Sequence, residues 1–106
     1  MLYIVAHLYA YPGKEAELRE FETHALGIAR KHGGELMCAF APECAVTFGE
    51  TPTEVHVLRF ADQTTFENFK GDPEHAAISD WRATVIRKTV VFVSGEIVEY
   101  GNCPGD

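Results

Sequence analysis

The stretch EVHVLRFADQTTFENFKGDPEHAAI, residues 54–78, decides the fold. Residues 54–60 are a short apolar run that predicts a strand. Its side chains point alternately to two faces, with Val55, Val57 and Arg59 on one and His56, Leu58 and Phe60 on the other. Asp62 is a favoured N-cap for the helix that follows, and Gly71 ends that helix. Asp72 then caps another helix, whose first residue is a proline.

The first third of the chain predicts one more strand and one more helix. Residues 2–11 alternate with a period of two, which is typical of a strand with two different faces. One face carries Leu2, Ile4, Ala6, Leu8 and Ala10, and the other carries Tyr3, Val5, His7, Tyr9 and Tyr11. Residues 14–32 carry apolar side chains at helical spacing, and Gly33-Gly34 supplies the stop that such helices favour.

The middle of the chain predicts a strand with a break in it. Residues 35–40 place alternate apolar side chains on one side. Pro42 cannot donate a hydrogen bond to a sheet, so we expect the strand to be interrupted there and to resume over residues 44–48.

The last part of the chain predicts a helix followed by a strand. Apolar residues spaced along 78–85 continue the helix that Asp72 begins. Residues 89–94 are β-branched and aromatic, which favours a strand. Gly95 should bend that strand, and residues 96–100 would extend its pairing. We expect a single domain over residues 1–100 and a C-terminal tail over 101–106.

The resulting order, β-α-β-β-α-β, is that of the ferredoxin-like fold, which belongs to the α+β class. It predicts a four-stranded antiparallel sheet whose helices cover only one face. The other face would carry the tyrosine-rich side of residues 2–11, which is too apolar to be left in water. We therefore expect a homodimer in which the uncovered faces of two sheets pack together.

The composition excludes several classes of function. The net charge is −7, from 16 acidic and 9 basic residues, so the protein's field repels nucleic acid and anionic membrane surfaces. No apolar run approaches the roughly 20 residues of a membrane-spanning helix, and the N-terminus lacks the pattern of a signal peptide. Cys38, Cys44 and Cys103 are odd in number, which favours reduced cysteines in a cytoplasmic protein and leaves a Cys38–Cys44 bridge as the alternative.

Two segments resemble a bacterial family catalogued as domain of unknown function 1330. Residues 11–34, YPGKEAELREFETHALGIARKHGG, resemble its first helix, which a Pro-Gly turn opens and a His-Gly-Gly closes. Residues 55–73, VHVLRFADQTTFENFKGDP, resemble its third strand and second helix, with an aromatic-bearing helix and a proline-containing break. The resemblance covers roughly residues 3–95, and it is carried by glycines, prolines and core aromatics.

Through this family the chain is similar to the dimeric α/β-barrel superfamily, which implies a pocket between sheet and helices or at the subunit boundary. Members of that superfamily include cofactor-independent monooxygenases, haem-dependent peroxidases, chlorite-degrading enzymes and lactone isomerases. Residues 37–50, MCAFAPECAVTFGE, lack the Arg-Gly-Gly and Trp-Pro elements of the family. The resemblance therefore implies a fold and a pocket, and it implies no particular substrate.

His7 and Arg59 are the residues that we expect to be catalytic. Histidine changes its charge near neutral pH, so His7, in mid-strand between Val5 and Tyr9, suits a general base. Its alternative role is that of a hydrogen-bonded histidine in a dimer interface. Arg59, at the end of an apolar strand, suits the binding of a carboxylate or a developing oxyanion, and its alternative is an ion pair with a glutamate.

Five more residues are candidates for the wall of a ligand pocket: Tyr3, Tyr9, Tyr11, Trp81 and His24. The tyrosines offer hydroxyl groups and flat rings, and they also suit plain interface packing. Trp81 falls on a core stripe, and His24 lies at the margin of another, where a surface position is the alternative. The pattern assigns no chemistry to His56 or His75.

Two functions remain, and the sequence does not decide whether the protein is an enzyme. No metal site is expected, because the 5 histidines are scattered and no HExxH or paired CxxC motif occurs. We expect no cofactor, and haem stays open because one proximal histidine leaves no spacing signature. The first function is a homodimeric pocket that binds an aromatic or carboxylate-bearing metabolite, with proton transfer or monooxygenation as the reaction. The second is a non-enzymatic dimeric binding or accessory module.

Overall fold

A computed structural model describes residues 1–101 and contains a sheet of four strands in the order β2-β3-β1-β4. β1 (Leu2–Ala10) and β3 (Glu54–Phe60) are central, and β2 (Glu35–Phe40) and β4 (Ile86–Ser94) form the edges. All neighbouring strands are antiparallel. With one helix after β1 and the remaining helices after β3, this is the predicted ferredoxin-like fold of the α+β class.

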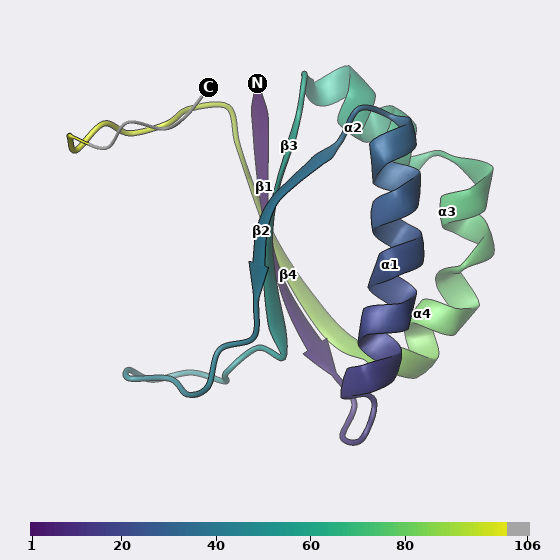
Figure 1. Cartoon of the computed structure of the whole chain (residues 1–106), viewed down its shortest axis with the longest axis vertical. Coiled ribbons are helices and arrows are strands. Elements are labelled where there is room, and N and C mark those ends of the chain that lie inside the picture. Colours follow the sequence, from purple (N-terminus) through teal and green to yellow (C-terminus); the bar gives the residue numbers. More distant parts are fainter. Residues whose placement is uncertain (102–106) are drawn as a thin grey trace.

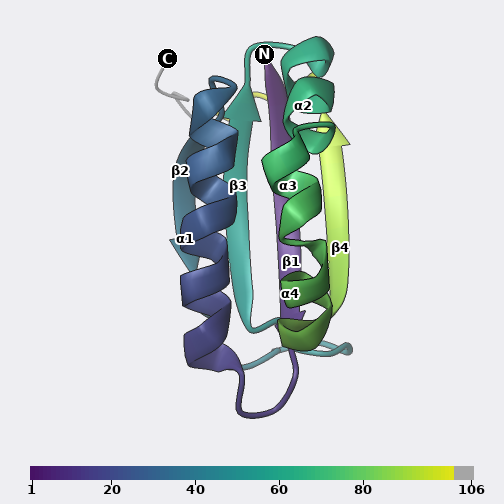
Figure 2. The same ribbon diagram turned by 90° about the vertical axis from the view of Figure 1, so that its right-hand side faces the viewer.

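All helices lie on one face of the sheet (Figure 1). α1 (Glu15–Lys31) runs along the β2 and β3 side of that face. α2 (Gln63–Lys70), α3 (Pro73–Ala77) and α4 (Ser79–Val85) follow one another in a second column over the β1 and β4 side (Figure 2). The helical layer therefore consists of one long helix beside three short ones.

Local sequence signals set the ends of these helices. The Asp62 carboxylate accepts a hydrogen bond from the Thr65 N–H at 2.8 Å, and the Asp62 N–H donates to Thr65 Oγ1, which completes a capping box. Asp72 caps α3 by accepting from the Glu74 N–H at 2.7 Å. Gly33, with a φ of 80°, follows the last turn of α1, as predicted.

The core between sheet and helices is divided into two clusters. The first consists of Leu2, Ile4, Ala29, Leu58, Phe60 and Phe66. The second consists of Leu8, Leu18, Phe21, Val85 and Ile86. Between them, the middle of β1 presents Ala6, which pairs with His56 on β3 and Val91 on β4. Because a methyl group stands where its neighbours in the row have large side chains, space remains between the two clusters.

Two predicted strand segments are wrong. Residues 41–53 form no strand, and β2 ends before Pro42, whose missing N–H stops the ladder. The predicted extension over residues 96–100 does not form either. β4 ends at Ser94, where the side-chain hydroxyl accepts a hydrogen bond from the Glu96 N–H at 3.1 Å and the chain leaves the sheet.

The second helical segment also differs from the prediction of one continuous helix. It is divided at Ile78 into α3 and α4, and Ile78 packs against the second core cluster. β4 begins at Ile86, earlier than predicted, because α4 passes directly into the strand with Ile86 already extended and buried.

The described cysteines are reduced. Cys38 and Cys44 are free and exposed, so the bridge that the sequence left open does not form. Apart from Gly101, the predicted tail lies outside the described residues, and Cys103 lies outside them with it. No described helix is long and apolar enough to cross a membrane.

The sheet face opposite the helices is not covered by any described element. Residues 41–53 and 95–101 project on that side (Figure 1). Phe40 and Phe92 are exposed there, and their pairing partners belong to the uncovered face of the central strands. Phe48, in the first projecting segment, is fully exposed.

Candidate functional site

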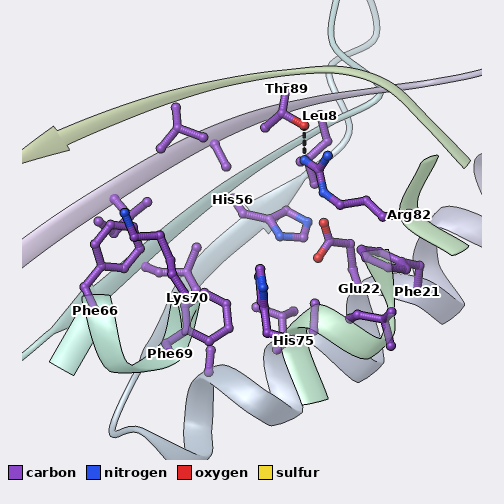
Figure 3. Close-up of a pocket in the computed structure, with 18 of the residues that line it drawn as sticks. Leu8, Phe21, Glu22, His56, Phe66, Phe69, Lys70, His75, Arg82 and Thr89 are labelled. Carbon is purple, nitrogen blue, oxygen red and sulfur yellow. Dashed lines mark hydrogen bonds between the residues drawn. The ribbon is translucent and has the colours of Figure 1, made fainter. Parts of the chain in front are cut away.

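A cavity of about 420 Å³ lies between the sheet and the helices (Figure 3). Large apolar side chains from both core clusters line it, namely Ile4, Leu8, Phe21, Leu58, Phe60 and Phe66. Phe66 and Phe69 lie at one end, and Glu22 and Arg82 lie at the other, with His56 between them (Figure 3). The volume falls within the roughly 300–1,000 Å³ of small-molecule sites.

His56 is held by a buried carboxylate. It lies in the helix-facing row of β3 and is only 3% exposed. Its Nε2 lies 2.8 Å from Glu54 Oε1, and the other oxygen of Glu54 accepts a hydrogen bond from Arg19 Nε at 3.0 Å. An ionised Glu54 accepts from Nε2–H, so in the neutral form of the ring the lone pair is on Nδ1.

The second ring nitrogen of His56 borders the cavity. Nδ1 makes no hydrogen bond to any residue in the described part of the chain. In that part no fully buried side-chain nitrogen or oxygen lacks a hydrogen-bond partner, so Nδ1 reaches open space. The open space that His56 lines is the cavity.

Glu22 enters the cavity from α1, on the same helical stripe as Leu18 and Ala25. Within residues 1–101 its carboxyl group makes no hydrogen bond and no ion pair. Burial raises the pKa of Glu22, and the positive charge of Arg82, with that of His56 when its ring is protonated, opposes that rise only in part. The carboxyl therefore keeps its proton to a higher pH than an exposed glutamate does.

Arg82 and His75 bring two more nitrogen groups to the cavity. Arg82 Nη2 donates a hydrogen bond to Thr89 Oγ1, which holds the guanidinium against β4 (Figure 3). Burial lowers the pKa of His75, and the Arg82 cation lowers it further. The His75 ring meets Phe69 edge-on, with 4.8 Å between ring centroids.

The arrangement combines an imidazole, a carboxyl group of raised pKa and the cations Lys70 and Arg82 beside an apolar space. A guanidinium is a strong donor to carboxylate and carbonyl oxygens. No group of three or more histidine, cysteine, aspartate or glutamate side chains within residues 1–101 is placed to hold a metal ion.

The two residues predicted to be catalytic do not line this cavity. His7 lies on the uncovered face of the sheet, where its ring meets Phe92 edge-on with centroids 5.6 Å apart. Arg59 lies on the same face and forms an ion pair with Glu35 at 3.1 Å, which is the alternative stated for it above. Tyr3 is the pairing partner of Arg59 on β1. Catalytic roles for His7 and Arg59 remain predictions.

The other predicted pocket residues are dispersed. Tyr9 is buried on the uncovered face, and Lys88 Nζ lies 4.6 Å from its ring centroid. Tyr11 is exposed just beyond the end of β1. Trp81 packs against the second core cluster, and its ring meets His24 edge-on at 5.3 Å. The structure therefore does not bring these candidates together around one cavity.

The sequence pattern did not single out His56, Glu22 or Arg82, although two of them carried a signal. His56 shares the core-facing row of its strand with Leu58 and Phe60, and a polar residue in such a row is unusual. Glu22 lies on an apolar helical stripe in the same way. Arg82 carried no such signal, because its place in the cavity depends on how α4 meets β4.

The comparisons identify the family. The family model described as Domain of unknown function (DUF1330) matches residues 1–96. The chain belongs to this family. The DUF1330 match confirms the resemblance carried by the Pro-Gly turn and the Gly-Asp-Pro break. No curated protein matches the sequence.

Several solved structures share the fold of this DUF1330 chain. An uncharacterised NIPSNAP domain protein from Burkholderia xenovorans has a TM-score of 0.74 at 18% identity, covering 99% of this chain and 100% of that one. The RPA0582 protein of unknown function from Rhodopseudomonas palustris has a TM-score of 0.79 at 10% identity, covering 92% and 83%. A dabb family protein with a ferredoxin-like fold from Mesorhizobium loti has a TM-score of 0.69 at 14% identity, covering 92% and 97%. At these identities the likeness shows the fold alone.

Proposed function

We propose that this DUF1330 chain binds a small, largely apolar metabolite with one oxygen-bearing end in the cavity between sheet and helices. The observation that supports the proposal is the unequal chemistry of the two ends of the cavity. Phe66 and Phe69 line one end, where Lys70 Nζ lies 4.7 Å from the Phe66 ring centroid, and Glu22, His56 and Arg82 lie towards the other. A ligand with one ring or two fused rings would pack them against Phe66 and Phe69, and its carbonyl or carboxylate group would accept hydrogen bonds from Arg82.

The proposal keeps the aromatic or carboxylate-bearing ligand expected from the sequence and moves its site to the other face of the sheet. It requires no cofactor, because side chains of the cavity would make every contact named here. It also requires neither nucleic acid nor a membrane. The free, exposed thiols of Cys38 and Cys44 suit the reducing cytoplasm that we propose as its location.

The single tryptophan provides a binding signal. The centroids of the Trp81 and Phe21 rings lie 5.1 Å apart, and Phe21 lines the cavity beside Glu22, so a ligand whose oxygen-bearing end reaches this part of the cavity should change Trp81 fluorescence. The protein is titrated with benzoate, phenylacetate, cinnamate, 2-indanone and 2-tetralone. We expect at least one of these compounds to bind with saturation.

Two cavity variants and one control test where the ligand lies. Arg82→Met should weaken carboxylate binding about 10- to 100-fold, because a hydrogen bond to a charged group contributes roughly 1.5–3 kcal/mol. Ala25→Leu should weaken every panel member by filling the cavity. Arg87→Met makes the same chemical change on an exposed part of β4 and should leave binding unchanged. Equal affinities for wild type and Ala25→Leu would contradict the proposal.

We also propose that the chain forms a homodimer through the uncovered face of the sheet. The exposed Phe40 and Phe92 support this, because large apolar side chains on a bare sheet favour burial against a partner. Phe92→Asp should yield a monomer in light scattering, whereas Ala83→Asp, on the exposed side of α4, should leave the dimer intact. A monomeric wild type at sub-millimolar concentration would contradict the proposal. A dimer that binds no panel compound would instead favour the non-enzymatic accessory module.

A further inference from the structure

We infer that the cavity transfers protons on an enolisable carbonyl compound, with His56 as the base and Glu22 as the acid. The inference rests on the proposed small-molecule site and adds a reaction class to it. The two side chains come from different elements, β3 and α1, and both line the same cavity.

His56 has the arrangement of a base whose free nitrogen faces the ligand. Glu54 accepts from Nε2 at 2.8 Å, so in the neutral ring the lone pair is on Nδ1, the nitrogen that borders the cavity. Arg19 binds the second oxygen of Glu54 at 3.0 Å and fixes the carboxylate behind the ring. Glu54 is therefore a positioning residue, which sets the tautomer of His56 and would face the charge that forms when the ring takes a proton.

Glu22 has the complementary arrangement of an acid. Its carboxyl group reaches the cavity and has no partner within the described part of the chain, so its proton is available to a ligand. Burial raises the pKa of Glu22, which keeps the group protonated where an exposed glutamate would have ionised. Two glutamates thus lie near one histidine in different environments, because Glu54 accepts two hydrogen bonds and Glu22 accepts none.

The step is balanced without an oxidant or a cofactor. His56 Nδ1 takes a proton from the carbon next to the carbonyl, and the electron pair of that C–H bond becomes the new C=C bond. The carbonyl π electrons move to oxygen, which takes the proton of the Glu22 carboxyl and forms an enol. Return of the His56 proton to the same or a conjugated carbon, and of the enol proton to Glu22, regenerates both groups. Arg82, held by Thr89, would stabilise the negative charge that develops on oxygen.

The test measures exchange of the α-hydrogens of 2-indanone and 2-tetralone in D₂O by proton NMR, beside fluorescence titrations of the same two ketones. We expect the wild-type protein to accelerate exchange over the buffer rate. His56→Gln and Glu22→Gln should each reduce the acceleration at least tenfold, since positioned proton transfer contributes roughly 10²- to 10⁴-fold. Glu20→Gln makes the same change on the exposed side of α1 and should leave the rate unchanged.

Each outcome decides between the two proposals. A ketone that binds without accelerated exchange overturns the inference and leaves the binding proposal standing. Loss of exchange in His7→Gln, with full activity in His56→Gln, also overturns it. If neither ketone binds, the proton-transfer inference is overturned, and so is the proposal that such ketones bind in the cavity.

A measurement on the wild type tests the inference independently of how the variants fold. In ¹⁵N NMR of the neutral ring, His56 of the wild type should carry its proton on Nε2. In a separate measurement, Glu54→Gln should disturb that tautomer. A proton on Nδ1 in the wild type would overturn the assignment of His56 as the base. Glu22→Gln is nearly isosteric and keeps the cavity volume, so it tests the acid where His56→Gln is unstable.

Discussion

Replacing glycine by alanine should destabilise the protein at Gly34, next to the cavity wall. An added Cβ there would lie 2.7 Å from Phe60 Cζ and 2.9 Å from the Ala29 carbonyl oxygen. Phe60 is only 1% exposed, and Phe66 and Phe69 pack against its ring, so it can move away only into the cavity and only by losing those ring contacts. Overpacking of this kind destabilises by about 1–3 kcal/mol. At about 4–8 °C per kcal/mol for a domain near this size, an effect of about 2 kcal/mol lowers the melting temperature by about 8–16 °C.

The same substitution should have the opposite effect at Gly27. This glycine lies inside α1, and an added Cβ would meet only Arg30 Nη2, at 3.9 Å. Alanine in a helix interior is more favourable than glycine by about 0.5–1 kcal/mol, so Gly27→Ala should raise the melting temperature by about 2–8 °C. Thermal unfolding followed by circular dichroism, at one pH and concentration, compares both variants with the wild type. An unchanged melting temperature for Gly34→Ala would refute the reasoning, because Phe60 would then move into the cavity without cost.

Three further predictions concern charge and cofactor content. Glu22→Gln should stabilise the protein at neutral pH. Burial raises the pKa of Glu22 in the folded protein, so the stability that the protonated carboxyl contributes is fully present below the pKa of the unfolded chain and is lost as pH rises through the folded pKa. Glutamine has no charge to bury and does not suffer that loss. Asp72→Asn should act in the opposite direction, because hydrogen bonds from Lys31 and His32 lower the pKa of Asp72, and the stability that this carboxylate contributes is lost as pH falls through the folded value. Urea denaturation at several pH values between acid and neutral checks both predictions. If the free energy of unfolding of a variant depends on pH in the same way as that of the wild type, the assignment for that residue is contradicted. Finally, the purified protein should show no visible absorption, whereas a Soret band would reveal haem.

The fold could be predicted because its signals are local. The period of two over residues 2–11, the caps Asp62 and Asp72, and the stop at Gly33 each act within a few residues of where they stand. The errors fell where local patterns were ambiguous. Residues 96–100 carry a strand-like composition, but β4 ends at Ser94, whose hydroxyl hydrogen-bonds to the backbone of Glu96 instead.

The cavity could not be predicted because it depends on contacts between distant parts of the chain. Ala6 leaves space only because the register of β1 places it between His56 and Val91. The burial that raises the pKa of Glu22 comes from the packing of α1 against elements far along the sequence. Sequence reasoning chose Arg59 because a cation stands out in an apolar strand, and it had no means of placing the glutamate that binds it.

The division of the helical layer into one long helix and three short ones affects how this architecture can diversify. α2 and α3 each carry their own N-terminal capping aspartate, so a change of length or sequence in one can be absorbed before the next begins. Such a change would reshape one side of the cavity while the ladder between β1 and β3 keeps its register. The shape of the cavity can therefore vary in small, separate steps while the sheet that forms its other wall stays constant.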